Sequence, residues 1–294
     1  MEWTPGGPNS DVEDRRDESG GGLGGGGFGG FGIGHLGIGG VIIVGLLSLV
    51  FHTNLFTLFS GGGQTTTQSV RTVPDPQRDA QEQPEAHFVG DIVFRDIQNT
   101  WDRILPDLAN RPYHHAHLVL FRNPIPSGCG LAQAAVGPFY CPEDEKVYLD
   151  LGFFDELRQR FGAPGQFAQA YVIAHEIGHH VQKILGIEPK VRRLQQANPD
   201  EQNPLSVRLE LQADCFAGIW AHSTENHATI TSSDIDSALG AAAAVGDDRL
   251  QRMATGRVSP ETFTHGSSAQ RTGWFKQGFQ NGDIASCNTF QRRQ

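Results

Sequence analysis

Two histidines flank a glutamate in the segment His175-Glu-Ile-Gly-His179. Because residues four apart lie one above the other on an α-helix, His175 and His179 can each offer a ring nitrogen to the same metal ion. In hydrolases this pattern binds zinc, and the glutamate between the histidines accepts a proton from a water at the metal. We therefore expect one zinc ion per chain, with Glu176 as the general base. The alternative is a surface helix whose histidines are solvated.

A catalytic zinc needs a third protein ligand, and Glu210 and Asp214 are the candidates. They are four residues apart and share one face of a helix that is otherwise largely apolar. A carboxylate in such surroundings needs a cation or a hydrogen-bond donor. We expect Glu210 to bind the zinc and Asp214 to accept the free N–H of a zinc-bound imidazole. The reverse assignment, with Asp214 as the ligand, stays open.

A well-formed helix must hold the two histidines in place. Pro164 and Gly165 can begin this helix and Gly186 can end it. Between them, apolar residues recur at helical spacing at Phe167, Ala170, Ala174, Ile177, Val181 and Ile184. The sequence therefore predicts an amphipathic helix over residues 166–185.

These motifs resemble the gluzincin arrangement, in which a glutamate is the third zinc ligand and an aspartate four residues later supports a histidine. The chain is more closely similar to the bacterial family of putative neutral zinc metallopeptidases. The matching segments are residues 137–142, 147–150, 168–176, 210–218, 246–250, 263–266 and 268–271. The resemblance begins at about Val89, continues to the C-terminus and includes a glycine-rich N-terminus with a membrane span. It implies a zinc peptidase.

The resemblance also places His265 near the zinc. Hydrolysis of a peptide bond develops negative charge on the carbonyl oxygen, which needs a hydrogen-bond donor. His265 is the first candidate for this donor, with Tyr140, Tyr148 and Arg271 behind it. The alternative is a histidine that only caps a helix or lies in a loop.

The remaining histidines and a nearby acidic pair are not expected to bind this zinc. His180 points about 100° away from His179 around the helix, which indicates a surface or supporting position. Asp247 and Asp248 are interpreted as a helix-terminal or packing feature. A cluster before a predicted strand could hold a second metal or form a polar strand entry, and it consists of His114, His115 and His117.

The chain divides into four parts by composition. Residues 1–30 are glycine-rich with mixed charges and are expected to be disordered. Residues 31–59 are long and apolar enough for one transmembrane helix. Residues 60–86 predict a flexible linker, and residues 87–294 predict the metallopeptidase domain. A cleaved signal peptide and a buried core helix are the alternatives for the apolar segment.

The domain is expected to be α+β and zincin-like, mostly helical with a small sheet. Strands are predicted at residues 117–121 and 146–150, the second as the edge strand to which an extended peptide can add. In addition to the helix that carries His175 and His179, further helices are predicted at residues 91–105, 153–161, 206–218, 233–244 and 260–278.

Four cysteines without a Cys-x-x-Cys spacing predict two disulfides and an oxidising compartment. Their pairing is not fixed by the sequence, and we favour Cys129–Cys141 and Cys215–Cys287. The spacings do not suit a zinc–thiolate site. Basic residues are balanced around the apolar segment and do not decide its orientation. The cysteines therefore favour a cytoplasmic N-terminus and a catalytic domain outside the bacterial inner membrane.

Together these features predict a membrane-anchored zinc peptidase that acts on peptides or proteins. A net charge of −10 without basic clusters argues against a nucleic-acid partner. One alternative is a membrane-tethered interaction or scaffold protein with a structural zinc. Such a site closes its shell with four ligands and does not need Glu176. Another alternative, a zinc amidase acting on cell-wall peptide, would use the same residues.

Overall fold

The computed structural model describes residues 3, 7–18, 76–134, 137–224 and 229–291. The predicted transmembrane helix, residues 31–59, lies outside the described residues. Among the residues described, no helix combines the length and the apolar composition that crossing a membrane requires.

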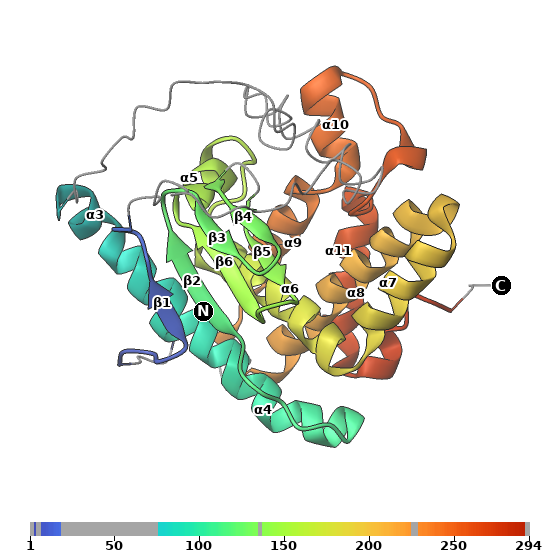
Figure 1. Cartoon of the computed structure of the whole chain (residues 1–294), viewed down its shortest axis with the longest axis horizontal. Helices are drawn as coiled ribbons and strands as arrows, with labels where there is room; N and C mark the ends of the chain where they lie inside the picture. The colour runs from blue at the N-terminus through green and yellow to red at the C-terminus, as the bar shows by residue number, and fades with distance from the viewer. Residues whose placement is uncertain (1–2, 4–6, 19–75, 135–136, 225–228, 292–294) are drawn as a thin grey trace, which may run out of the picture.

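A small sheet lies beside a larger group of helices, which confirms an α+β domain that is mostly helical (Figure 1). The strands are β1 (Val12–Asp14), β2 (His117–Phe121), β3 (Ile125–Ser127), β4 (Gly130–Ala132), β5 (Phe139–Cys141) and β6 (Lys146–Asp150). The longer helices are α3 (Pro76–Ala86), the π-helix η2 (His87–Phe94), α4 (Arg95–Ala109), α5 (Gly152–Gln159), α6 (Gln166–Ile184), α7 (Ile187–Ala197), α8 (Gln202–Ser223), α9 (Ser232–Ala244), α10 (Asp247–Thr255) and α11 (Ser268–Asn281). Short 3-10 turns are η4 (Pro199–Glu201), η6 (Pro260–Thr262) and η7 (Ile284–Cys287).

The main sheet has the strand order β1-β2-β6-β5, while β3 and β4 form a separate hairpin. The two predicted strands are confirmed as β2 and β6, and they pair in parallel. The prediction that residues 146–150 form an edge strand is wrong, because β5 pairs with β6 in antiparallel orientation and occupies that edge. A strand of three residues is too short to produce a recognisable alternation of apolar and polar positions.

The prediction of disorder for residues 1–30 is wrong for residues 7–18. Val12, Glu13 and Asp14 pair in parallel with Leu118, Val119 and Leu120 of β2. Composition misses such a segment because backbone hydrogen bonds and charged contacts hold it, and it needs no apolar core of its own.

The prediction of a flexible linker is wrong for residues 76–86, which form α3. The helix is held by polar contacts along its length. Arg122 lies 2.7 Å from Glu82 and also pairs with Asp79, and the Gln169 amide donates to Glu85 at 2.6 Å. These partners lie far away in the sequence, so the polar composition of α3 alone gives no sign of them.

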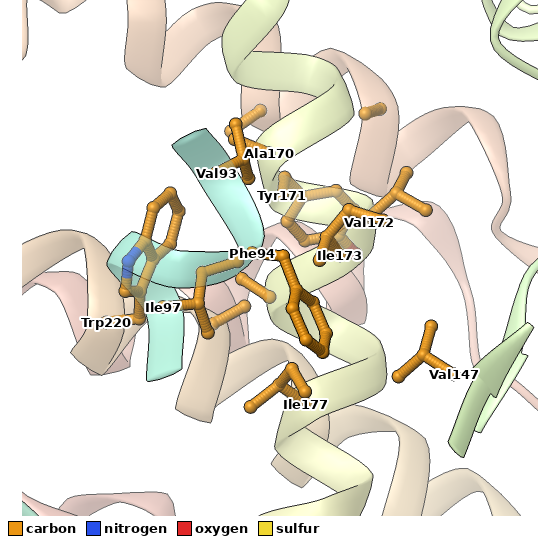
Figure 2. Close-up of a cluster of buried hydrophobic side chains, with 14 of the residues drawn as sticks. Val93, Phe94, Ile97, Val147, Ala170, Tyr171, Val172, Ile173, Ile177 and Trp220 are labelled. Atoms are coloured by element: carbon orange, nitrogen blue, oxygen red, sulfur yellow. The ribbon is translucent and has the colours of Figure 1, made fainter. Parts of the chain in front are cut away.

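The helix predicted over residues 166–185 is confirmed as α6, and it runs through the centre of the domain. It lies between Val147 of β6 on one side and Trp220 of α8 on the other, with Phe94 and Ile97 packed against it (Figure 2). Burying each of these large apolar side chains contributes roughly 1.5–3 kcal/mol to folding. Packing around α6 therefore fixes the helix that carries His175 and His179.

Glycines allow the helices around the site to approach one another closely. A Cβ atom on Gly178 of α6 would lie 2.9 Å from the carbonyl oxygen of Ala213 in α8. A Cβ atom on Gly278 of α11 would lie 1.9 Å from the carbonyl oxygen of Cys215, also in α8. Side chains at these two positions would push α6 and α11 away from α8, so α8 is held between them by contacts that only glycine permits.

Both favoured disulfides are confirmed. Cys215 in α8 is bonded to Cys287 in η7, and Cys129 is bonded to Cys141 at the end of β5. The first bond fixes the end of the described chain against the helix that carries Glu210. The second ties the β3–β4 hairpin to the edge strand.

The prediction of one helix over residues 260–278 is wrong, because the chain forms η6, a loop and then α11. Gly266 has a φ of 92°, which a helix does not allow. Ser267 then caps α11, and its hydroxyl accepts from the backbone N–H of Gln270. The loop that results carries His265.

Candidate active site

The structure brings together His175 and His179 from α6 and Glu210 from α8. The Nε2 atom of His175 lies 3.2 Å from Glu210 Oε2, and the Nε2 atom of His179 lies 3.5 Å from Glu210 Oε1. The three side chains can each offer one donor atom, with all three atoms within 4.8 Å of one another. His175 is buried, and the other two are partly exposed.

This group suits a zinc ion. Zinc bonds to histidine nitrogen and carboxylate oxygen at about 2.0–2.2 Å, so two ligands in a tetrahedral shell are about 3.4 Å apart. The separations of 3.2 and 3.5 Å between Glu210 and the two histidines agree with that value. The lowered pKa of Glu210 is consistent with an anionic ligand: burial opposes ionisation, but the charges of His179 and His265 outweigh it. Glu210, His175 and His179 can therefore hold the metal.

Asp214 lies behind His175, as the first of the two assignments predicted. It is fully buried and accepts from His175 Nδ1 at 2.8 Å, which leaves Nε2 free to face Glu210. Arg271 donates two hydrogen bonds to the carboxylate, each 2.9 Å long, and Tyr171 donates a third. Although burial raises the pKa of Asp214, the Arg271 charge holds it below its usual value. This geometry favours Glu210 as the ligand and Asp214 as its support.

His179 has a supporting partner that the sequence analysis missed. The side-chain oxygen of Gln182 lies 2.9 Å from His179 Nδ1, and the Gln182 amide donates to the Leu209 carbonyl at 2.7 Å. Gln182 thus orients His179 as Asp214 orients His175, and it also links α6 to α8. Its position three residues after His179 places both on one helix face, which could have identified it.

We call the three side chains His175, His179 and Glu210 the donor group, because each can donate an atom to a metal. Glu176 lies beside the donor group and is also buried, with 8% of its surface exposed. Burial raises the pKa of its carboxyl group, while the charges of His175 and His179 and a hydrogen bond from the backbone N–H of Tyr140 lower it. The net effect is a raised pKa, which makes the carboxylate a better proton acceptor than an exposed glutamate. The backbone of edge strand β5 thus donates a hydrogen bond to the candidate general base.

His265 is placed by Asp247 at the start of α10. One Asp247 oxygen accepts the backbone N–H groups of Thr264 at 2.7 Å, His265 at 2.7 Å and Gly266 at 3.1 Å. The other lies 3.1 Å from His265 Nδ1. Burial lowers the pKa of His265, but the charges of Glu210 and Asp247 outweigh it and raise the pKa. Asp247, expected as a helix-terminal residue, therefore also shapes the loop that brings His265 to the donor group.

The other candidates for the hydrogen-bond donor to the oxyanion have different surroundings. Tyr148 donates to Asp144 at 2.7 Å and does not line the pocket, so it is not a partner of His265. Tyr140 does line the pocket, but its hydroxyl is 2.9 Å from His180 Nδ1. Arg271 also lines the pocket and is held by Asp214.

His180 is fully buried, so the surface alternative is wrong, and its polar partners are the Tyr140 hydroxyl and the His114 carbonyl rather than a side chain of the donor group. Its Nε2 lies 2.7 Å from the His114 carbonyl oxygen, and both ring nitrogens are therefore engaged.

With His114 and Glu145, His180 forms a second group that has the composition of a metal site. However, the Lys183 ammonium lies 2.6 Å from Glu145 and supplies the positive charge there. The predicted cluster of three histidines does not meet at a metal site, because His115 contacts Asp11 and Asp102 instead.

A pocket of about 510 Å³ opens at the donor group. His175, Glu176, His179, Glu210 and His265 all line it. Edge strand β5 forms part of its wall, and other apolar side chains in the lining include Phe153, Phe161, Val172, Leu209, Val245 and Leu250. An extended peptide with apolar side chains could therefore reach the candidate base and metal ligands.

Residues 1–290 match the family described as "Putative neutral zinc metallopeptidase". The chain is 47% identical over 291 residues to "Uncharacterized protein YpfJ" of Escherichia coli (strain K12), an alignment that covers 99% of both proteins. It is 45% identical over 205 residues to "Uncharacterized protein Rv2575" of Mycobacterium tuberculosis, covering 66% of this chain and 67% of that protein. No solved structure matches the chain.

Proposed function

The chain belongs to the family of putative neutral zinc metallopeptidases, and we propose that it is a zinc-dependent peptidase acting on peptides or proteins. One observation carries the proposal. Buried Glu176 lies beside a group of three metal donors, and the pocket that reaches it has an edge strand in its wall. We further propose the zincin type of substrate binding, in which an extended peptide lies along β5.

The residues of the site divide the chemistry between them. A bound zinc would polarise the scissile carbonyl and lower the pKa of a water towards ~7. Glu176 accepts the proton from the attacking water and delivers it to the leaving nitrogen. His265 donates a hydrogen bond to the developing oxyanion, while Asp247 holds its Nδ1 side. Asp214 and Gln182 keep the Nε2 atoms of the two histidines directed at the metal.

The scaffold alternative explains less of this arrangement. A structural zinc is normally enclosed by four protein ligands, whereas the donor group consists of three in the part of the chain that the structure describes. The group also opens into a pocket, and a structural site has no use for a buried carboxylate beside it. These features favour catalysis.

The proposal is tested with purified full-length protein and an unfolded protein substrate such as casein. We expect cleavage products in mass spectrometry, loss of cleavage on adding a chelator, and recovery on adding one equivalent of zinc. A zinc-loaded protein that cleaves no peptide bond in a broad peptide library would contradict the peptidase assignment.

Replacing His265 with alanine is expected to lower the turnover rate by ~10²–10³-fold, the usual effect of losing one oxyanion donor. Zinc content should stay at one equivalent, because Glu210 and the two α6 histidines are intact. Turnover and bound zinc are measured on the same preparation. His117→Ala, at an exposed position at the start of β2, is the matched control. Full activity of the His265→Ala protein would show that His265 has no part in catalysis. Loss of zinc from that protein would show that His265 is a metal ligand.

We also propose that the peptidase is anchored by residues 31–59 in the bacterial inner membrane, with its domain outside the cytoplasm. The two disulfides support this placement, because such bonds persist in oxidising compartments. The length and apolar composition of residues 31–59 support the anchoring.

A further inference from the structure

Residues 7–18 are bound to the domain by backbone hydrogen bonds along its sheet edge. The Leu118 N–H donates to the carbonyl of Asp11 at 2.8 Å, and the Arg15 N–H donates to the carbonyl of Leu120 at 2.8 Å. Between these two bonds, β1 is paired in register with β2. The segment is therefore the outermost strand of the main sheet.

Side chains at the start of the segment fit the π-helix η2. The Asn9 N–H donates to Asp91 at 2.8 Å, and the Asn9 side chain donates to the Gly90 carbonyl at 3.0 Å. Val12 packs onto Gly90 so closely that a Cβ atom there would lie 3.1 Å from a Val12 methyl group. These contacts fix the position of the segment as well as its backbone pairing.

The end of the segment is held by charge. Arg16 is 4% exposed and donates to Asp14 at 2.6 Å and to Gln83 of α3 at 3.0 Å. Glu13 lies 2.6 Å from the Lys146 ammonium of β6. Partners of the segment thus come from several distant parts of the domain, as expected of a built binding site and not of a loose tail.

This docking restricts how the chain can sit at a membrane. A single crossing by residues 31–59 would leave residues 7–18 and the domain on opposite faces, where β1 could not pair with β2. We infer that residues 7–18 and the peptidase domain lie on the same face of the membrane, so residues 31–59 do not cross it once. The same holds if β1 docks onto a second copy of the chain.

The inference rests on the anchoring proposed above and replaces the cytoplasmic placement of residues 1–30. Because the domain carries two disulfides, the shared face is the one outside the cytoplasm. Two helical crossings would take roughly 40 residues, more than residues 31–59 provide. We therefore expect attachment from one face only.

The test uses two serine-to-cysteine variants of the full chain, at exposed positions on either side of the apolar segment. Ser10→Cys reports the N-terminal segment and Ser232→Cys reports the domain. Spheroplasts are treated with a membrane-impermeant maleimide before or after lysis, and carbonate-washed membranes are analysed. We expect both cysteines to be labelled before lysis. Labelling of one before lysis and of the other only after it would overturn the inference.

Two other outcomes separate this inference from the proposals on which it rests. Labelling of both cysteines only after lysis would support the shared face and overturn the extracytoplasmic placement. Recovery of the chain in the carbonate supernatant would overturn the anchoring, and with it the inference. None of these results bears on peptidase activity, which is measured separately.

A cross-link shows whether β1 is docked in the membrane-bound protein. The Asp11 carboxylate lies 2.6 Å from His115 Nδ1, so cysteines at these two positions face each other. In membranes, the Asp11→Cys, His115→Cys variant is treated with a short bismaleimide and then cut at a protease site inserted between residues 60 and 75. We expect the two pieces to stay joined, and those of the Asp11→Cys single variant to separate. Separation in both variants would overturn the inference.

Discussion

Replacing Glu176 with glutamine is expected to lower peptide hydrolysis by ~10²–10⁴-fold or more, the usual effect of losing a general base. Glutamine has the same shape and can still accept the hydrogen bond from the backbone N–H of Tyr140. Its neutral amide cannot take a proton from water. Because Glu176 lies outside the group of three metal donors, the variant should keep one equivalent of zinc.

Turnover and zinc content are measured on the same Glu176→Gln preparation, with circular dichroism as a check of the fold. Glu201→Gln is the matched control, because it makes the same change at an exposed position outside the pocket. Its activity should be that of the unaltered protein. Unchanged turnover of a zinc-loaded Glu176→Gln protein would remove the proposed mechanism.

Removing a metal ligand should abolish both zinc binding and activity. In His179→Ala the donor group loses one of its three atoms, and the Glu210 carboxylate loses a partner 3.5 Å away. The expected result is no stoichiometric zinc after dialysis. Because a ligand at 100 times its Kd stabilises a folded protein by about 2.7 kcal/mol, the rise in melting temperature that zinc produces should also disappear.

Two comparison variants make this result specific. His87→Ala removes a histidine that is 46% exposed and belongs neither to the donor group nor to the pocket lining, so zinc binding should not change. Asp214→Asn should weaken zinc binding by about 10–100-fold without abolishing it, the usual effect of losing the partner of a metal-bound histidine. A His179→Ala protein that retains one tightly bound equivalent would contradict the ligand assignment.

The parts of the fold that sequence predicts best are those with long, regular patterns. The repeated apolar positions from Phe167 to Ile184 were enough to place α6, and the apolar runs of β2 and β6 were enough to place both strands. By contrast, β1 and α3 are held by partners far away in the sequence, and β5, which pairs with nearby β6, is only three residues long. Their own residues carry little signal, because edge pairing and ion pairs leave no periodic pattern.

The residues of the candidate site also differ in how well the sequence predicts their contacts. His175 and His179 were predicted to meet because residues four apart share one face of a helix, and Glu210 was added because a catalytic zinc needs a third protein ligand. The hydrogen bonds between Asp247 and the loop that carries His265 could not be predicted, because they depend on how α10 packs beside α11. Arg271 was a candidate for the oxyanion donor ranked behind His265, and the close approach of α11 to α8 at Gly278 brings it to Asp214.

The dependence of α8 on α11 and η7 has a consequence for biosynthesis. His265, Arg271 and Cys287 leave the ribosome long after the zinc ligands, and until then Asp214 lacks the guanidinium that neutralises it. A partly made chain can contain every metal ligand and still have neither the oxyanion donor nor the closed disulfide. Under the proposed mechanism, a chain that still lacks His265 hydrolyses peptides ~10²–10³-fold more slowly than the finished protein, so full activity appears only when the C-terminal part has been made.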